Sequence, residues 1–234
     1  LREGSFRDAN VTSLVLNLAD RSNSYRLSGD GSMSMISENN INETGFASRL
    51  EFEKTKGQVR YSLRHRFADE KYDKNDLGFQ RNNNFNDFTG NVSYQIFKPT
   101  KHFNSLRVRL FAGHFRRFEP SVSTGYYTQI AFSATNLKQL SYGLELGTNI
   151  GERVDFFEPR TEGRFWKRNG QFSTEASFSS DFRKRFAFEI GLDYRSRYGT
   201  DEYSYELVLA PRFRVNDKLE FAYGFTLDSS FNQP

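Results

Sequence analysis

The sequence predicts an all-β protein, an antiparallel up-and-down transmembrane β-barrel of which this chain holds about 12 strands. In most of the chain, apolar residues occupy every second position and small, polar or charged residues lie between them. Short and long connections alternate between these runs. Successive side chains of a strand point to opposite faces, so each run has one apolar and one polar face. A membrane barrel needs that combination, with lipid outside and a polar lumen inside.

The alternation is clearest between Lys184 and Leu227, where three runs follow one another. Their apolar positions are Phe186, Phe188, Ile190, Leu192 and Tyr194, then Tyr203, Tyr205, Leu207 and Leu209, then Leu219, Phe221, Tyr223, Phe225 and Leu227. The positions between them carry small and charged side chains, as at Glu189, Gly191 and Asp193. One face is therefore aromatic and aliphatic, and the other has the composition of a wall in contact with water.

The same pattern places the other strands in chain order. The predicted strands cover 11–19, 24–36, 44–54, 58–67, 87–97, 104–115, 125–136, 139–150, 171–181, 184–195, 202–213 and 218–228. The first is the least regular, because Val15 lies between Leu14 and Leu16. Most have roughly 10 to 13 residues, the length that a tilted strand needs to cross the hydrocarbon layer.

The connections support the same architecture. Short ones are predicted at 19–22, 54–57, 97–103, 136–138, 182–183 and 215–218, and longer ones at 37–43, 68–86, 116–124, 151–170 and 196–201. Outer-membrane barrels have short periplasmic turns and long outer loops. A soluble sandwich with Greek-key crossings is not expected to alternate in this way.

The order of the connections also predicts how the chain lies within the barrel. The first hairpin closes with a short turn, so the first strand runs toward the periplasm and the last one away from it. Bacterial barrels usually keep both termini in the periplasm, so we expect at least one further strand at each end. Residues 1–234 are thus predicted to be a single barrel domain, and a fragment of a barrel with about 14 or more strands.

Composition argues against several classes of protein. No run of about 18 apolar residues is present, so no transmembrane helix is predicted. The 33 basic and 29 acidic residues form no long block of one sign, which gives no indication of nucleic-acid binding. The absence of cysteine excludes disulfides and thiolate metal sites. The histidines His65, His102 and His114 fit no catalytic or metal motif, so we predict neither an enzyme nor a cofactor.

Charges on the polar face are distributed unevenly. Basic side chains are expected to line the lumen from the earlier strands, namely Arg49, Arg60, Arg64, Arg66, Arg107 and Arg109. Acidic side chains are expected to line it from the later strands, namely Glu145, Glu175, Asp181, Glu189, Asp193, Glu206 and Glu220. Such a separation can orient polar or zwitterionic solutes on a path through the barrel. The alternative is that these charges pair with one another or with a plug and fill a closed barrel.

The loop predicted at 68–86 is rich in carboxylate and amide side chains. The loop offers oxygen ligands of the kind that calcium accepts at Asp69, Glu70, Asp73, Asn75 and Asp76. Their spacing does not match a calcium-binding loop, which needs ligands at alternate positions and a glycine at the sixth. A solvated or lid-forming turn is the alternative, and no metal is predicted.

A second candidate for binding is the aromatic and cationic loop 156–168. Phe157, Arg160 and Trp166 can stack on a sugar or bind a partner, since tryptophan and arginine are favoured at binding sites. The alternative is an aromatic girdle at the membrane interface together with a loop folded over the mouth of the barrel.

Two segments carry a resemblance to a known family. Tyr72–Asn84, which reads YDKNDLGFQRNNN, and Phe157–Arg160, which reads FEPR, resemble landmarks of an uncharacterised outer-membrane family of Bacteroidota. By the order of strands and loops, the resemblance covers roughly Gly45 to Pro234. It implies a C-terminal barrel preceded by a module similar to carbohydrate-binding family 9, with the present residues supplying part of the barrel alone. The family provides no catalytic residues to carry over.

Together these features predict a non-enzymatic protein of the bacterial outer membrane. The predicted role is a pore, or the membrane anchor of a surface sugar-handling or secretion assembly. Expected partners are outer-membrane lipid or lipopolysaccharide and other surface proteins. Two alternatives stay open: a plugged structural barrel that binds partner proteins through its long loops, and a soluble β-sheet protein that binds lipid.

Overall fold

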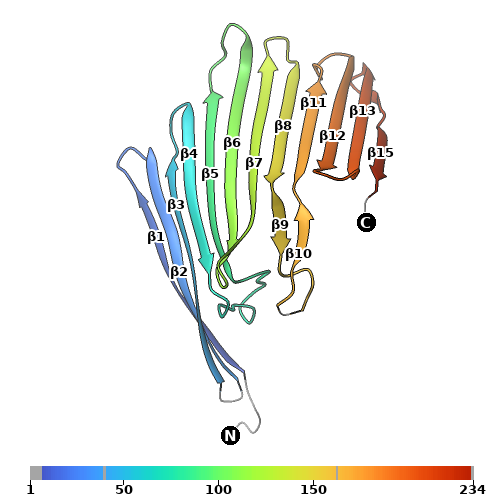
Figure 1. The fold of residues 1–234 in the computed structure, drawn as a ribbon. Coiled ribbons are helices and arrows are strands. Elements are labelled where there is room, and N and C mark those ends of the chain that lie inside the picture. The colour runs from blue at the N-terminus through green and yellow to red at the C-terminus, as the bar shows by residue number, and fades with distance from the viewer. Residues whose placement is uncertain (1–6, 39–40, 162, 233–234) are drawn as a thin grey trace. The chain divides into compact units, whose positions relative to one another are not determined.

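The computed structural model describes residues 7–38, 41–161 and 163–232, and all regular elements in these ranges are β-strands (Figure 1). They are β1 (Asp8–Ala19), β2 (Tyr25–Glu38), β3 (Ile41–Lys54), β4 (Val59–Ala68), β5 (Phe85–Ile96), β6 (Phe103–Arg117), β7 (Val122–Asn136), β8 (Ser141–Ile150), β9 (Glu152–Asp155), β10 (Trp166–Asn169), β11 (Gln171–Ser179), β12 (Phe186–Arg197), β13 (Tyr203–Asn216), β14 (Leu219–Ala222) and β15 (Phe225–Phe231). The predicted all-β class is confirmed.

Thirteen strands form one antiparallel sheet in which strands that follow one another in the chain are hydrogen-bonded neighbours. Its order is β1 to β8 and then β11 to β14, with β15 paired to β13. Strands β9 and β10 form a separate two-stranded ribbon. The predicted up-and-down meander is therefore confirmed. The sheet is not closed into a barrel, because β1 at one end and β14 at the other have no ladder to each other in the described chain.

The chain divides into two compact units, which we describe one at a time. The first comprises the described residues up to Asn91 together with Gly113–Tyr126 and Val154–Lys167. The second comprises Val92–Ala112, Tyr127–Arg153 and the described residues from Arg168 onward. Strands β5, β6, β7, β9 and β10 contribute residues to both units.

In the first unit, the two faces of the sheet have opposite character. On one face of β3 lie Phe46 and Leu50, which are 51% and 49% exposed. On the other face lie Gly45 and Arg49, and Gly45 is directly opposite Ser34 of β2. Ser34 is only 1% exposed. The polar face is therefore the more buried one, and the apolar face is open.

In the second unit, the strand register aligns side chains in rows that cross several strands. One row across β8, β11, β12, β13 and β15 consists of Leu144, Ala176, Leu192, Leu207 and Leu227. The leucines of this row are 40% to 58% exposed. The apolar face of this unit is thus open as well, and side chains one position further along each strand lie on the polar face.

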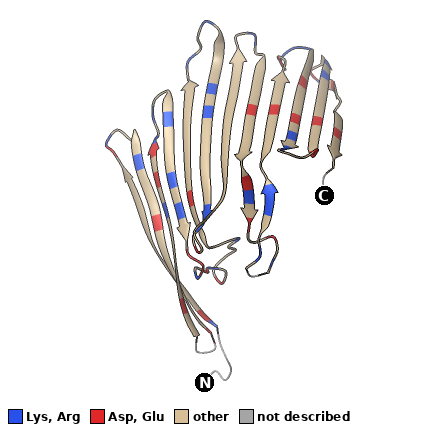
Figure 2. Ribbon diagram, viewed as in Figure 1, with Lys and Arg blue, Asp and Glu red and all other residues tan. Residues whose placement is uncertain are grey.

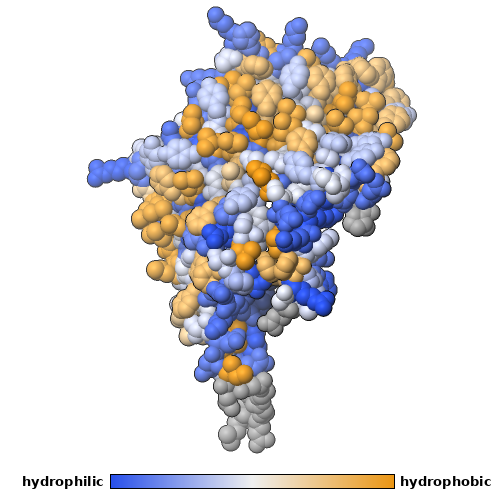
Figure 3. All heavy atoms as spheres, in the orientation of Figure 1, coloured by the Kyte–Doolittle hydropathy of each residue, from blue (hydrophilic) through white to orange (hydrophobic). Residues whose placement is uncertain are grey.

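The described part of the chain has no sizeable hydrophobic core. Its buried hydrophobic residues are Ile36, Ala68, Tyr72, Ala134 and Ala187. Large apolar side chains lie at the surface instead, where Figure 3 shows them as orange areas. The same residues contain no helix with the length and hydropathy of a membrane span.

The last predicted strand, 218–228, is interrupted in the structure. β14 and β15 both pair with β13, and the pairs on either side of the break share one register. Tyr223 lies in the break, and its N–H donates to the carbonyl of Pro211 at 3.0 Å. Proline has no N–H with which to return the second hydrogen bond of such a pair, so the ladder is broken there.

Other connections also differ from the prediction. β2 and β3 extend to Glu38 and Ile41, which lie opposite each other, in place of a loop at 37–43. β6 and β7 likewise extend to Arg117 and Val122. The apolar alternation fades at these ends, but ladder hydrogen bonds use the backbone and continue without it. The ribbon of β9 and β10 was not predicted, because strands of four residues are too short to show an alternation of apolar and polar residues.

Candidate functional site

The polar face of the first unit carries ion pairs between neighbouring strands. Arg49 contacts Asp30 at 3.0 Å, and Arg64 contacts Glu51 at 2.7 Å. The Glu51 residue is only 8% exposed. Arg60 donates from Nε to the carbonyl of Gly57 at 3.2 Å. These predicted lumen arginines therefore have local partners, as the paired-charge alternative expects.

A further pair in the same unit joins β4 to β5. Arg66 Nη2 donates to the Asp87 carboxylate at 2.9 Å, and the guanidinium of Arg66 also lies over the ring of Phe85 at 5.0 Å. Asp87 is 6% exposed. A buried carboxylate needs such a partner, because burial of an unpaired charge is costly.

In the second unit, the two predicted arginines of β6 differ. Arg109 reaches Glu145 at 3.8 Å and donates to Gln129 at 3.4 Å. Gln129 in turn donates to the Glu145 carboxylate. Arg107 is exposed and makes no ion pair with any residue that the structure describes.

Five acidic side chains form a row across the polar face of the second unit. They are Glu145 on β8, Glu175 on β11, Asp193 on β12, Glu206 on β13 and Asp228 on β15, each directly opposite the next. Directly opposite residues lie about 4.5 to 5.5 Å apart, and like charges at that spacing repel. Figure 2 shows red bands on these neighbouring strands.

Among the described residues, two arginines form ion pairs with this acidic row. Arg195 contacts Asp193 at 3.2 Å from the same strand, and Arg109 contacts Glu145. Glu189, also predicted to line the lumen, lies outside the row, opposite Ser179 and Ala210. The row is thus a strip of largely uncompensated negative charge, which is stable only where water or counterions reach it.

The loop between β4 and β5, residues 69–84, is anchored to the polar face of the first unit. The carboxylate of Asp69 accepts hydrogen bonds from the backbone N–H of Phe46, Lys71 and Tyr72 at 2.8, 3.0 and 2.7 Å. The Asp69 N–H donates to the Phe46 carbonyl at 3.0 Å. At the other end of the loop, the Asn84 N–H donates to the Asp69 carbonyl at 3.0 Å. The two ends are therefore held together, as in a compact Ω-loop.

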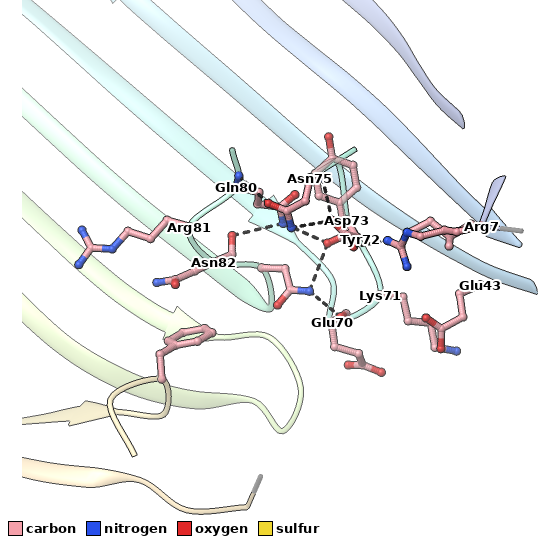
Figure 4. A pocket seen from close by; sticks show the side chains of 13 residues that line it. Arg7, Glu43, Glu70, Lys71, Tyr72, Asp73, Asn75, Gln80, Arg81 and Asn82 are labelled. Carbon is pink, nitrogen blue, oxygen red and sulfur yellow. Dashed lines mark hydrogen bonds and ion pairs between the residues drawn. The ribbon is translucent and has the colours of Figure 1, made fainter. Parts of the chain in front are cut away.

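Ser34 and Gly45 provide the surface on which this loop lies. Ser34 Oγ accepts a hydrogen bond from the Asp73 N–H at 3.1 Å. A Cβ placed on Gly45 would come within 2.2 Å of the Tyr72 nitrogen, so a larger residue there would push the loop away. Tyr72 is 7% exposed. Figure 4 shows this part of the loop with its polar side chains.

Arg7 provides a second anchor, just before β1. Its guanidinium donates to Glu38 at 3.1 Å, to Asp73 at 2.9 Å and to Asp76 at 3.1 Å. The hydrogen bond to Asp76 is the largest cause of a raised pKa for Arg7. The pKa of Asp73 is lowered, mainly because the Asn75 N–H donates to its carboxylate, and Arg7 adds to the effect. The loop is thus held by charge-assisted hydrogen bonds between Arg7 and the carboxylates.

Amide side chains complete the internal structure of the loop. Gln80 N–H donates to Asn75 Oδ1 at 2.9 Å, and Gln80 Nε2 donates to the Tyr72 carbonyl at 3.0 Å. Asn84 donates from Nδ2 to the Glu119 carbonyl at 2.7 Å, and it accepts from the Glu119 N–H at 2.8 Å. The predicted binding residue Asn75 therefore shapes the loop.

A pocket of about 440 Å³ lies beside the loop. Asp73 and Asn75 line it, and so does Phe157 from the loop between β9 and β10. Glu43, Glu70, Lys71, Arg81 and Asn82 are also on its wall. Asp76, Arg160 and Trp166, which the sequence grouped with these residues, do not line it. Within the described ranges no group of histidine and carboxylate side chains has metal-site geometry.

The aromatic loop 156–165 is organised by its neighbours. The Phe156 ring packs against Phe165 with centroids 5.4 Å apart, and the Arg117 guanidinium lies 4.5 Å from the Phe156 centroid. The Phe157 side chain is 47% exposed and lines the pocket. Trp166 begins β10 and is 44% exposed.

Sequence reasoning missed Arg7, Ser34 and Gly45 among the residues that hold the 69–84 loop, and it considered Asp69 only as an oxygen ligand. Gly45 carries a readable signal, because a glycine inside a strand often marks a close approach of another backbone. Asp69 carries another, because aspartate just after a strand often accepts hydrogen bonds from the following N–H groups. Arg7 and Ser34 give no signal, since their partners are distant in the chain.

Comparison with known proteins gives one match. The model of DUF5916, a domain of unknown function, matches residues 1–234. The chain belongs to the DUF5916 family. Neither a curated protein nor a solved structure matches it. Membership of DUF5916 confirms the resemblance at the level of the family, while the outer-membrane location and the link to Bacteroidota remain predictions.

Proposed function

We propose that this domain is the membrane-spanning part of a bacterial outer-membrane β-barrel, as expected for a Bacteroidota protein, with its apolar face toward lipid. The supporting observation is the pair of adjacent rows in the second unit. The leucine row from Leu144 to Leu227 is open on one face, and the acidic row from Glu145 to Asp228 lies on the other. Lipid on the first face and water on the second satisfy both rows.

Energetics favour lipid over water for the apolar face. Leaving a leucine or phenylalanine side chain in water instead of burying it costs about 1.5–3 kcal/mol. Exposed positions such as Phe46, Leu63 and Leu192 recur through both units. Soluble monomers rarely expose contiguous apolar patches above a few hundred Å². A hydrocarbon environment removes this cost.

Closure into a barrel is part of the proposal. The outer edges of β1 and β14 lack ladder partners in the described chain. Unpaired backbone N–H and C=O groups are not tolerated next to lipid. We therefore propose that the edges are joined in the membrane, directly or through further strands, in a barrel of about 14 or more strands.

The proposed role is non-enzymatic: a pore, or the anchor of a surface sugar-handling or secretion assembly. The acidic row supports a water-lined path, because its exposed members Glu175, Glu206 and Asp228, which make no ion pair with a described residue, require solvent or counterions. A plugged structural barrel is the second candidate. It is supported by the 69–84 loop on the polar face and by the ion pairs of Arg49, Arg64 and Arg66.

Fractionation and conductance together test the proposal. The full-length protein should sediment with outer membranes, resist carbonate extraction and need detergent for solubility. In planar bilayers a pore should give discrete conductance steps, and a plugged barrel should give none. A chain that purified without detergent as a monodisperse species would contradict the membrane assignment.

A further inference from the structure

We infer that the 69–84 loop lies inside the lumen and narrows it, so that solutes pass beside the loop. The inference rests on the proposed function, because it takes the polar face as the lumen wall. If that face lines the lumen, a loop fixed to the same face must occupy part of the opening.

The position of the loop follows from strand parity. Gly45 and Arg49 are on the same face of β3, since residues an even number apart share a face. The loop touches that face at Gly45, where the Tyr72 nitrogen would lie 2.2 Å from an added Cβ. Ser34, opposite Gly45, accepts the hydrogen bond from Asp73. The loop therefore lies on the side of the ion pairs and away from Phe46 and Leu50.

The loop is fixed in this position by two anchors. Asp69 binds it to the β3 backbone through Phe46, and Arg7 binds Asp73 and Asp76. Both anchors use charge-assisted hydrogen bonds, which are about twice as strong as neutral ones. A loop held in this way acts as a permanent constriction.

The pocket beside the loop indicates which solutes would pass. Its wall carries Glu43 and Glu70 as well as Lys71 and Arg81. Charges of both signs give little preference for one sign of ion, and they interact with small polar or zwitterionic solutes. Its volume of about 440 Å³ suits small molecules.

One engineered protein tests the constriction, because its loop is released when the protein is reduced and fastened again when it is oxidised. In the full-length chain, Asp69→Ala and Arg7→Gln remove the anchors. Ser34→Cys and Asp73→Cys, at positions where Ser34 Oγ is 3.1 Å from the Asp73 nitrogen, allow a disulfide that fastens the loop again. Residues 1–234 contain no cysteine, so this pair is the only one within them. Asp217→Asn, in the turn between β13 and β14, serves as the control.

Single-channel conductance in potassium chloride is the readout, with heat-modified gel migration as the check of folding. We expect the reduced protein to conduct about twofold or more above wild type, and the oxidised protein to return to the wild-type value. Equal conductance of the reduced and the oxidised protein would contradict the proposed constriction, while the proposed pore would still stand. No conductance from any folded variant would overturn the pore, and the constriction with it, in favour of the plugged barrel.

Discussion

Glu145 and Glu175 lie directly opposite each other on β8 and β11, so two carboxylates of the same sign face each other across a strand pair. On the other side of Glu175 lies Asp193, again directly opposite. Like charges that lie directly opposite each other destabilise a sheet. We therefore propose that the acidic row interacts with water, ions or solutes at the polar face and does not stabilise the fold.

Neutralising the middle of the row should stabilise the protein. Glu175→Gln removes repulsion with both neighbours, and we expect a gain of about 0.2–1 kcal/mol in the free energy of unfolding. Urea unfolding in lipid vesicles measures it, and the gain should shrink as salt is added. Glu189→Gln is the control, because Glu189 faces Ser179 and Ala210. Equal effects of the two substitutions would contradict this explanation.

Adjacent residues of β13 test which face meets lipid. Leu207→Arg places a cation on the apolar face, where it should cost about 2–4 kcal/mol near the bilayer midplane. Glu206→Arg, one position earlier, places the same cation on the polar face within the acidic row, and it should cost little. The folded fraction after assembly into vesicles measures both. Normal assembly of the Leu207 variant would show that the orientation is wrong.

Gly45 is expected to be intolerant of even one methyl group. Gly45→Ala should lower the free energy of unfolding by about 1–3 kcal/mol or displace the loop, because the new Cβ meets the backbone of Tyr72. Protease cleavage within 69–84 reports displacement. Gly31→Ala is the matched control on the neighbouring strand, since nothing lies within 4 Å of a Cβ there. Similar results for both would remove the support for close packing of the loop.

The turn after β11 should make stability sensitive to acid. Arg183 donates from Nε and Nη2 to the Asp181 carboxylate at 2.9 Å each, which is the main cause that lowers the pKa of Asp181 from 3.8 to about 2. A lowered folded-state pKa stabilises the fold above the ordinary value of 3.8, and this contribution is lost as pH falls toward 2.

Unfolding followed between about pH 5 and pH 2 measures this contribution. Asp181→Asn should flatten the profile in that range, whereas Asp217→Asn should leave it unchanged. An unchanged profile in the Asp181 variant would assign the acid sensitivity to other carboxylates.

Much of the strand pattern was predictable because alternation is local. Leu207 and Glu206 are assigned to opposite faces from their neighbours in the chain alone, and the register confirms that Leu207 joins the leucines and Glu206 the acids. The break at Tyr223 was not predicted, because it depends on Pro211 in the neighbouring strand. Strand ends such as Glu38 and Ile41 were misplaced, since backbone pairing continues beyond the apolar pattern.

By itself, the sequence determined the class of the fold, the up-and-down order of the strands and the face on which each side chain lies. These properties follow from the period of an extended backbone, which neighbouring residues set. Tertiary structure decided which strands pair residue by residue, and so created the row from Glu145 to Asp228. It also decided that Asp69 and Arg7 fix a loop on Ser34 and Gly45. Such contacts join residues far apart in the chain, and no local pattern specifies them.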